Sequence, residues 1–489
     1  MKKIDFKNDF LEKIRLNLSK NTTFIQNHKF TYSDLNIYLN IIHDKLRKLQ
    51  FKEIFVICDK SLLSYVTHIY AFLSKKIWVP HSINKKEDET IEIISQLKDP
   101  LIIHFGRISS SNLKKYKCLD LKKVKFESKQ KNDLSNFISK SEKKSSDFMS
   151  KSQNITAIFF TSGSTGSPKG VKLSLSNILY NLTNMIIKIK PNSNDIFVDF
   201  HEVSFVISIP ILILSFVTGA SLVIGNNIDL INLKTFYKKY NFTILITVPT
   251  LLKIIQKSRH SPALKLNTLI TCGEPITKSL IDSIINKHKL KQFLNFYGAT
   301  EVSPWILSSD LRKCYDDNIF EDDYAPAGKS LNFVDLNINK KTKTLEAYGP
   351  VVSPGYLNLK SSKFKKINKY YKYDTGDIFV LRKNYYFCKG RKDHEFKKNG
   401  ERMSILHLEY LYRKILNKTN LFVVFLKEQN KLFLILEGNV NKRDKEKILY
   451  KVSKNKQPDY YLSLKSVSKT STGKISRSEL AKICNLHIS

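Results

Sequence analysis

The sequence is poor in acidic residues and has no closely spaced cysteine pair. Its six cysteines are spread over 489 residues without a CxxC pair, a spacing that suits neither a zinc site nor a disulfide framework and favours the reducing cytoplasm. The first ten residues, MKKIDFKNDF, have no apolar core, so no secretory signal is expected. These absences exclude the classes of small protein that are stabilised by disulfide bonds or by a zinc ion.

Acidic side chains number 44 against 82 basic ones, which gives a net charge of +38. Such an excess could serve nucleic acid, an anionic membrane or an acidic protein partner. Most of it is lysine scattered along the whole chain, and arginines clustered beside aromatic residues, which read bases best, are sparse. Nucleic-acid binding is therefore not expected, and an acidic protein partner is the stronger hypothesis.

Residues 204–225 form an uncharged run that is long enough to cross a bilayer. Pro210 and a break at 218–220 divide this run, which indicates a buried helix over 210–217 followed by a buried strand over 221–224. The sequence contains no second run of this kind. We therefore expect no transmembrane segment.

Strand-like and helix-like runs alternate along the chain, which is typical of βαβ units around a largely parallel sheet. Ser33, for example, is expected to cap a helix whose apolar face continues to Leu49. The predicted fold class is α/β, with a large N-terminal domain of parallel-sheet βαβ layers over residues 1–392 and a small C-terminal α+β domain over residues 393–489. Strands are expected at 54–57, 77–79, 101–103, 155–160, 244–248, 266–271, 292–297, 422–426 and 432–437, and helices at 62–73, 91–97, 405–415 and 442–452.

Glycines and hydroxyl residues gather directly after the expected strand over residues 155–160. In such a loop several backbone N–H groups can point at one anion, and hydroxyl groups and a lysine add further donors. Pro168 stands where a Walker A loop needs glycine, so the segment is not a loop of that kind. We expect a phosphate-binding loop between an apolar strand and a helix. Its candidate nucleotide-binding residues are Thr161, Ser162, Gly163, Ser164, Thr165, Gly166 and Lys169.

With this loop the chain resembles the adenylate-forming, or AMP-binding, superfamily of acyl-CoA synthetases, luciferases and adenylation domains of peptide synthetases. Four further segments follow in the order of the superfamily's motifs, so the resemblance covers nearly the whole chain. They are NFYGATE at 295–301, YDTGD at 373–377, GRKD at 390–393 and KTSTGKISR at 469–477. The CGE segment at 272–274 makes the chain most similar to stand-alone amino-acid adenylation enzymes of the D-alanine–carrier protein ligase type.

The resemblance implies an acid–thiol ligase with ATP and Mg²⁺ as cofactors. A carboxylate attacks the α-phosphate of ATP, pyrophosphate leaves, and the acyl-adenylate then passes its acyl group to a phosphopantetheine thiol and releases AMP. The implied catalytic residues are Lys474, Thr300 and Glu301. Lys474 would bridge the carboxylate and the α-phosphate, Thr300 would donate to the α-phosphate, and Glu301 would hold Mg²⁺.

The resemblance also assigns the nucleotide pocket and a hinge. Asp377 would accept the ribose hydroxyls, Arg391 would lie close to the ribose or phosphate, and Tyr297 would offer a flat face to adenine. Asp393 would be the hinge about which the mobile small domain rotates between the two half-reactions. The remaining adenine-side candidates are Gly273, Glu274, Asn295, Phe296 and Gly298.

The resemblance is weaker where the acid would bind. Amino-acid-activating members carry Phe-Asp-x-Ser, whose aspartate pairs with the substrate ammonium, but residues 205–208 read FVIS, with Val206 in that place. An ammonium buried against valine would be costly. Asp199 or Glu202 could supply the missing charge, and Cys272 would lie against the acid pocket. The acid is either a small amino acid or amino-acid-like acid, which we favour, or a short acyl or hydroxy acid. The substrate-binding candidates are Val206, Cys272 and Glu202.

The expected acceptor is an acyl or peptidyl carrier protein, because a basic surface attracts an acidic carrier, and coenzyme A is the alternative. A short-chain acyl-CoA synthetase is the competing enzyme, and a nucleotide-binding protein without catalysis is the competing class. The joint presence of Lys474, Glu301 and Asp377 argues against the second of these. We expect a cytoplasmic monomer.

Overall fold

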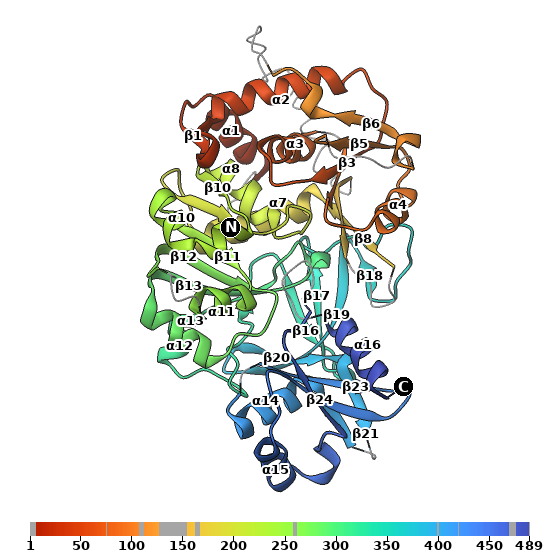
Figure 1. The fold of residues 1–489 in the computed structure, drawn as a ribbon. Helices are drawn as coiled ribbons and strands as arrows, with labels where there is room; N and C mark the ends of the chain where they lie inside the picture. Colours follow the sequence, from red (N-terminus) through yellow and green to blue (C-terminus); the bar gives the residue numbers. More distant parts are fainter. Residues whose placement is uncertain are drawn as a thin grey trace.

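Two large sheets with helices on and between them form most of the molecule, and smaller sheets follow towards the C-terminus (Figure 1). The computed structural model describes residues 6–74, 76–106, 112–126, 154–161, 167–257, 262–398, 401–418, 420–468 and 476–488.

The first sheet has six strands in the order β6-β5-β3-β4-β7-β8. Its first five strands run parallel, and β8 pairs with β7 in antiparallel fashion. Every residue of β3 is buried, as expected for a parallel strand that is covered on both faces. The bounds are β3 (Glu53–Cys58), β4 (Ile77–Ser82), β5 (Pro100–His104), β6 (Lys117–Asp120), β7 (Ile155–Thr161) and β8 (Lys169–Ser174).

The second sheet has nine strands in the order β15-β14-β13-β12-β11-β9-β10-β1-β2. The six strands from β13 to β1 run parallel, and the strands at both edges are antiparallel. The bounds are β1 (Thr23–Ile25), β2 (Phe30–Thr31), β9 (Ile196–Asp199), β10 (Ser221–Ile224), β11 (Ile244–Thr247), β12 (Lys265–Cys272), β13 (Lys289–Tyr297), β14 (Leu307–Asp310) and β15 (Lys329–Ser330).

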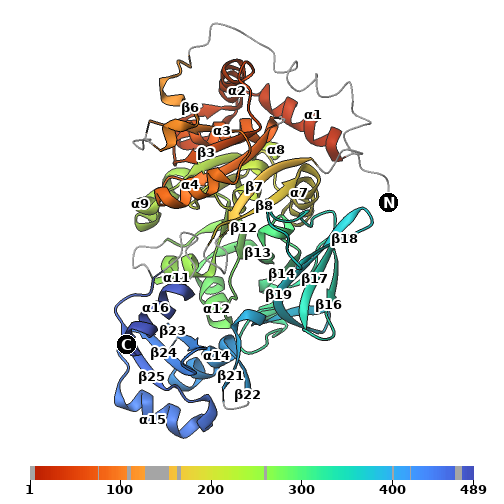
Figure 2. The same ribbon diagram turned by 90° about the vertical axis from the view of Figure 1, so that its right-hand side faces the viewer.

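Helices fill the space between the two sheets and cover their outer faces, which gives five layers (Figure 2). The inner layer contains α2 (Tyr32–Leu46), α3 (Leu62–Leu73), α7 (Leu175–Ile189) and α8 (Leu214–Thr218), with α1 (Phe6–Leu18) beside them. The outer layers contain α4 (Glu87–Ser95) on the first sheet, and α10 (Leu233–Tyr240), α11 (Pro249–Lys257), α12 (Lys278–Lys287) and α13 (Leu311–Asp316) on the second, where α9 (Asn227–Ile231) precedes α10. The expected α/β class with parallel-sheet layers is confirmed.

The residue expected to cap the helix that corresponds to α2 is wrong by two positions. Thr31, and not Ser33, caps α2, because Asp34 at the third helical position bonds back to Thr31 and completes a capping box. Leu49 lies beyond the end of α2 and is exposed.

The uncharged run over residues 204–225 is divided as its proline and glycine predict. It forms a short π-helix, η5 (Ile209–Ile213), then α8 and the buried strand β10. Gly219 ends α8 in the left-handed conformation that glycine adopts at helix ends. No helix within the described ranges is long and apolar enough to cross a membrane.

The C-terminal third is built from small helices and from strands that pair in antiparallel fashion, except for the parallel pair β24 and β25. A five-stranded sheet has the order β16-β17-β19-β18, with β20 beside β19, and is followed by the hairpin β21–β22 and the sheet β23-β24-β25. Two hydrophobic clusters are built from residues 396 onward and, among the residues that the structure describes, contain none from earlier in the chain. The bounds are β16 (Asp335–Ile338), β17 (Thr344–Gly349), β18 (Phe364–Ile367), β19 (Tyr370–Arg382), β20 (Tyr385–Arg391), β21 (Glu395–Lys398), β22 (Glu401–Ser404), β23 (Leu421–Leu426), β24 (Lys431–Glu437), β25 (Tyr460–Leu464), α14 (Ile405–Leu416), α15 (Lys442–Lys451) and α16 (Arg477–Ile488).

Candidate functional site

The segment expected to bind phosphate joins two antiparallel strands. Thr161 ends β7 and lies opposite Lys169, the first residue of β8, with Thr161 Oγ1 at 3.4 Å from the Lys169 carbonyl oxygen. The prediction of a helix directly after the loop is wrong, because the buried pair Val171 and Leu173 alternates with polar residues and makes a strand. The loop residues Ser162, Gly163, Ser164, Thr165 and Gly166 lie outside the described residues.

Loops that follow parallel strands of both sheets meet at one edge. Lys60, after β3, donates to the carbonyl oxygen of Asp199 at the end of β9, and Asn84, after β4, donates to Glu202. In α/β folds ligands bind outside the carboxyl ends of the strands. Further candidates at carboxyl ends are Thr161 on β7, Cys272 on β12 and Tyr297 on β13.

Three nucleotide candidates that are far apart in the sequence form one polar chain. The Tyr297 hydroxyl donates to Asp377 Oδ2 at 2.6 Å, and Arg391 Nη1 lies 3.3 Å from Asp377 Oδ1. Arg391 also reaches Asp393 Oδ2 at 3.8 Å. Burial and the charge of Asp377 raise the pKa of Tyr297, so its hydroxyl stays protonated and can donate. The side chains of Asp377 and Arg391 are 16% and 44% exposed, so the arginine is the more accessible of the two.

Other residues of the NFYGATE motif turn inward and hold the backbone. Asn295 is buried and donates to a backbone carbonyl at 3.0 Å, and Phe296 is buried with its ring centroid 4.9 Å from that of Trp305. At Gly298 a Cβ atom would lie 2.0 Å from the carbonyl oxygen of Pro304, so no larger residue fits. These three residues fix the position of the motif's backbone.

Glu301 lies in the short helix η6 (Thr300–Val302), whose first residue, Thr300, is half-buried like Glu301 itself. Glu301 Oε1 accepts a hydrogen bond from the Tyr356 hydroxyl at 2.8 Å, and its carbonyl oxygen accepts one from Ser353 N at 2.9 Å. Leu357, which follows Tyr356, donates to the Gly170 carbonyl at 2.7 Å. The Glu301 carboxylate is thereby placed beside the β7–β8 hairpin.

The donor set around Glu301 fits Mg²⁺ better than a metal held by protein alone. No group of three or more histidine, cysteine, aspartate or glutamate side chains that could hold a metal occurs among the described residues. Mg²⁺ is usually bound by one or two carboxylates together with substrate phosphates. A single carboxylate next to the expected phosphate-binding hairpin meets this requirement.

The loop after β12 is anchored to the start of α11. Gly273 has φ +80°, a conformation that glycine adopts without strain. Glu274 Oε2 accepts hydrogen bonds from the backbone nitrogen and the hydroxyl of Thr250 at 3.2 and 2.7 Å. Cys272 is buried, and its thiol lies 3.6 Å from the Thr247 carbonyl oxygen. Glu274 therefore orients this loop through α11, a role that the sequence did not indicate.

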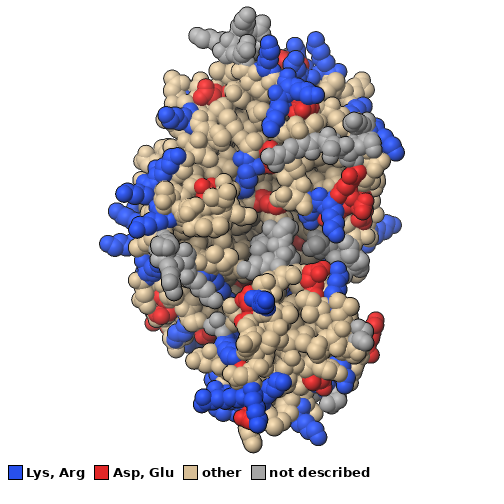
Figure 3. All heavy atoms as spheres, in the orientation of Figure 1, with Lys and Arg blue, Asp and Glu red and all other residues tan. Residues whose placement is uncertain are grey.

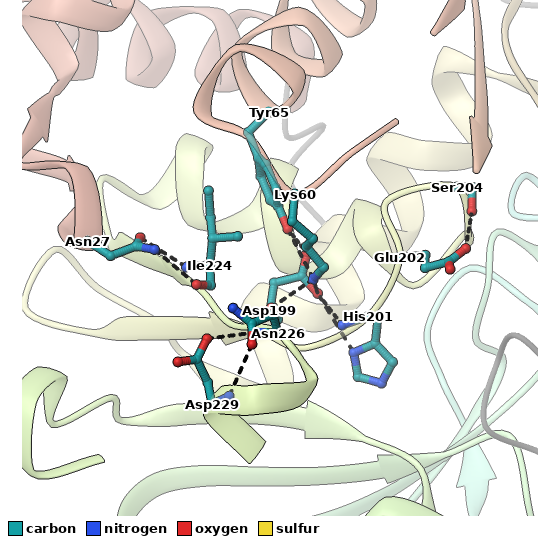
Figure 4. Close-up of polar contacts among 10 residues, drawn as sticks. All are labelled: Asn27, Lys60, Tyr65, Asp199, His201, Glu202, Ser204, Ile224, Asn226 and Asp229. Atoms are coloured by element: carbon teal, nitrogen blue, oxygen red, sulfur yellow. Dashed lines mark hydrogen bonds and ion pairs between the residues drawn. The ribbon is translucent and has the colours of Figure 1, made fainter. Parts of the chain in front are cut away.

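Asp199 is fully buried, and its charge is already compensated. The Tyr65 hydroxyl donates to Asp199 Oδ2 at 2.7 Å, and Lys60 Nζ lies 3.8 Å from Oδ1 (Figure 4). The backbone nitrogen of His201 donates to Oδ1 at 2.8 Å. With a side chain only 1% exposed, Asp199 presents no open charge to a substrate ammonium.

The His201 ring projects from the same loop on the far side from Tyr65 (Figure 4). The ring is 9% exposed, and Nδ1 lies 3.8 Å from Asp199 Oδ1. Burial lowers the pKa of His201 to about 4, with the nearby Lys60 lowering it further and Asp199 opposing, so the ring is neutral at physiological pH.

Glu202 lines a cavity of about 420 Å³, whereas Val206 does not. Glu202 Oε1 accepts from Asn84 Nδ2 at 2.8 Å, and Oε2 lies 3.4 Å from the Ser204 hydroxyl. Val206 is half-buried in the turn before η5 and contacts the main core. The cavity lining is Cys58, Asp59, Lys60, Ser61, Ser82, Ile83, Asn84, Lys122, Glu202 and Val203.

Lys474 lies outside the described residues, but the two ends of its segment are joined by a hydrogen bond from Ser476 N to Ser468 O at 2.9 Å. Arg477 begins α16, and its Nη1 lies 2.7 Å from Oε1 of Glu409, whose side chain is 2% exposed. This ion pair fixes the first turn of α16 against α14.

The helix α14 in turn contacts the part of the chain that precedes the expected hinge. Arg413 Nη2 lies 3.3 Å from Glu409 Oε2, and Arg413 Nη1 donates to the hydroxyl of Tyr324. Ser404, just before α14, donates to the carbonyl oxygen of Lys389 at 3.1 Å. Contacts of α14 and of the residue before it therefore hold the elements after Asp393 to those before it.

Sequence reasoning missed Tyr356, Lys60 and Tyr65. Lys60 carries no signal because it is one lysine among many, and a tyrosine in a helix is usually a core residue. Tyr356 follows Gly355 in a polar stretch, and only the tertiary pairing of the β7–β8 hairpin brings it to Glu301.

Basic side chains are spread over the visible face and do not gather in one continuous band (Figure 3). They occur at the upper end, along both sides and at the lower end, with acidic side chains between them. The field of this surface is therefore positive without a single tract that would follow a nucleic-acid backbone.

Comparison with known proteins agrees with this geometry. The model of the family described as AMP-binding enzyme matches residues 16–359. A D-alanine--D-alanyl carrier protein ligase from Bacillus velezensis is 27% identical over 277 residues, which are 53% of this chain and 54% of the relative, so the match spans about half of that protein. The enzyme of the same name from Bacillus cytotoxicus is 24% identical over 354 residues, 66% of this chain and 69% of the relative.

Solved structures with a similar fold cover almost the whole chain. The four-domain nonribosomal peptide synthetase holo-AB3403, bound to AMP and glycine, has a TM-score of 0.79 at 18% identity and covers 97% of this chain and 36% of its own. The o-succinylbenzoate CoA synthetase of Bacillus subtilis, bound to its acyl-adenylate, has a TM-score of 0.78 at 14% identity and covers 96% and 97%. At these identities the likeness establishes the fold.

Proposed function

Because the chain belongs to the AMP-binding enzyme family, we propose that it is an ATP-dependent acid–thiol ligase that adenylates a small carboxylic acid and transfers it to the phosphopantetheine thiol of a carrier protein. The observation that carries this proposal is the convergence of Tyr297, Asp377 and Arg391 at the strand ends, with Glu301 beside the β7–β8 hairpin. Residues from three separate segments supply an acceptor for hydroxyls, a cation and a metal-binding carboxylate.

In the first half-reaction an oxygen of the acid attacks the α-phosphorus of ATP and pyrophosphate leaves. Asp377 accepts the ribose hydroxyls, and Arg391 neutralises charge close to them. Lys169 and the Thr300 hydroxyl donate to phosphate oxygens, and Lys474 approaches the α-phosphate and the carboxylate together. Mg²⁺, held by Glu301, would reduce the repulsion between the two anions.

In the second half-reaction the thiol attacks the acyl carbonyl and AMP leaves. We place the boundary between a large domain and a small mobile domain at residues 392 and 393, with Asp393 as the hinge. Rotation about this hinge would exchange the lysine segment for the loop between β21 and β22. The hairpin β21–β22 directly after the hinge supports this assignment.

The relatives named above are D-alanine–carrier protein ligases, and this supports a small amino acid as the substrate. One observation favours the competing short-chain acyl-CoA synthetase: Asp199 is compensated by Lys60 and Tyr65, and Val206 offers no charge. Of the acid-side residues expected from the sequence, Glu202 is the carboxylate that lines the cavity and that a substrate ammonium could reach. An acidic carrier is favoured as acceptor by the positive surface. We also propose a monomer in the cytoplasm.

The test is acid-dependent exchange of labelled pyrophosphate into ATP with a panel of amino, hydroxy and short fatty acids. Wild type is expected to catalyse exchange with at least one acid of the panel, and this exchange should disappear in Lys474→Ala. Thioester formation on a carrier protein and on coenzyme A would then be compared with the accepted acid. Absence of exchange with every acid in the panel, together with absence of ATP binding, would contradict the proposal.

A further inference from the structure

The Tyr356 hydroxyl lies where three motif-bearing segments meet. It donates to Glu301 Oε1 at 2.8 Å, while the backbone of Tyr356 pairs with Val171 on β8, two residues after Lys169. The ring of Phe364 lies edge-on to Tyr356, with centroids 5.2 Å apart, and also contacts Tyr373 at 4.7 Å. Tyr356 therefore contacts the metal-ligand candidate and the hairpin, and through Phe364 it approaches the YDTGD segment.

The surroundings of Tyr356 restrict its movement. The residue is 8% exposed, and backbone hydrogen bonds hold both of its neighbours: Lys172 N donates to Gly355 O at 3.0 Å, and Leu357 N donates to the Gly170 carbonyl at 2.7 Å. A hydroxyl fixed in this way can hold an acceptor in one orientation.

The Glu301 carboxylate is held on one oxygen and is accessible on the other. Among the described residues, only Tyr356 donates a hydrogen bond to this carboxylate, and the bond goes to Oε1. Oε2 is left for a ligand. Burial, followed by the charge of Glu301, raises the pKa of Tyr356, so the hydroxyl keeps its proton over the physiological pH range.

We propose that Tyr356 is a positioning residue that orients Glu301 for the divalent cation of the bound nucleotide. This inference rests on the proposed function, since it needs a metal–nucleotide complex at Glu301. The ligand class is a divalent cation that is shared between one carboxylate oxygen and nucleotide phosphates. Tyr356 touches neither the cation nor the nucleotide, and acts only by fixing the orientation of the carboxylate.

The experiment compares Tyr356→Phe with Tyr348→Phe as a matched control. Tyr348, on β17 of the neighbouring five-stranded sheet, is half-buried, and its hydroxyl is 3.5 Å from a backbone carbonyl of Ile367 and not near Glu301. Mn²⁺ is titrated by electron paramagnetic resonance in the presence of a non-hydrolysable ATP analogue. The affinity for the analogue without metal is measured in parallel, and thermal unfolding confirms that each variant is folded.

Tyr356→Phe is expected to weaken Mn²⁺ binding by about tenfold, the lower end of what the loss of a partner that orients a metal ligand usually costs. Its affinity for the metal-free analogue should stay within about twofold of wild type, and Tyr348→Phe should leave both affinities unchanged. Mn²⁺ affinity within twofold of wild type in Tyr356→Phe would overturn the inference. Failure of wild type itself to bind Mn²⁺ with the analogue would instead reject the proposed role of Glu301, and with it this inference.

Discussion

The nucleotide side and the acid side of the candidate site differ in how far their charged side chains are exposed. On the nucleotide side the side chains of Asp377 and Arg391 are 16% and 44% exposed. On the acid side Asp199 is 1% exposed, and Lys60 and Tyr65 satisfy it inside the protein. The difference supports the proposal that charges select the nucleotide, whereas shape and neutral hydrogen bonds, together with Glu202, select the acid.

The largest effect is expected on the nucleotide side from Lys474→Ala. Removal of a cation that stabilises charge in the transition state should lower acid-dependent pyrophosphate exchange by about 10³-fold. Transfer of the acyl group from a supplied acyl-adenylate to the thiol should be largely spared. Equal loss of both half-reactions would reject the role proposed for this lysine.

On the acid side the corresponding test is Lys60→Met, which leaves Asp199 buried without its cation. Breaking one partner of a buried ion pair should lower the free energy of unfolding by about 3 kcal/mol, as measured by urea denaturation. The double variant Lys60→Met with Asp199→Asn should recover most of this loss. Additive losses in the double variant would show that the pair is not a unit.

Asp377→Ala should weaken ATP binding without a change in acid specificity. Loss of a charged acceptor for two hydroxyls should cost about 2 kcal/mol, or roughly thirtyfold in the KM for ATP. The preference among acids should stay as in wild type, because Asp377 lies on the other side of the site. An unchanged KM for ATP would move ribose recognition to another residue.

The neutral, buried His201 makes the acid side sensitive to low pH. Its folded-state pKa is lowered from 6.5 to about 4, so the unfolded chain binds a proton before the folded protein does, and stability falls as the pH drops from about 6.5 towards 4. This one ring should lower the free energy of unfolding by about 1.4 kcal/mol at pH 5.5 relative to pH 8. His201→Gln should flatten the pH dependence of thermal unfolding by that amount. An identical pH profile in the variant would assign the acid sensitivity to the other buried histidines.

The smallest effect is expected from Val206→Asp, which would add the charge that the acid side lacks. If residues 205–208 occupy the position that the sequence motif suggests, small amino acids should gain about fivefold over their deaminated analogues in pyrophosphate exchange, the range of one partly exposed ion pair. Equal use of both acids would show that Val206 does not face the substrate.

The parallel core could be predicted from local patterns. The expected helix over 62–73 coincides with α3, and the strands over 155–160 and 266–271 lie within β7 and β12. Buried parallel strands are short runs of aliphatic residues, which carry a strong local signal. The strands from β14 to β20 escaped prediction because most of them are short and mix polar with apolar residues without regular alternation.

The candidate site could be predicted only as separate motifs. The contact of Tyr297 with Asp377 depends on the position of β19 relative to β13, and that of Tyr356 with Glu301 depends on the pairing beside β8. Tertiary packing decides such contacts, and no local spacing encodes them. The helix expected directly after the phosphate loop is wrong because this segment pairs with β7 in antiparallel fashion as β8.

The place of β1 in the second sheet has a consequence for how the protein is made. β1 pairs with β2 within a few residues, but its other edge, where Ile25 meets Leu222, stays unpaired until about 200 further residues have been added, which takes roughly 10–40 s at typical rates of synthesis. Phe24 and Ile25, which are fully buried in the finished molecule, lack their later partners Phe216 and Leu222 during this time. The sheet β23-β24-β25, by contrast, closes within a short stretch of chain. Chaperones, or slower growth at low temperature, should therefore raise the yield of folded protein mainly by protecting the N-terminal segment.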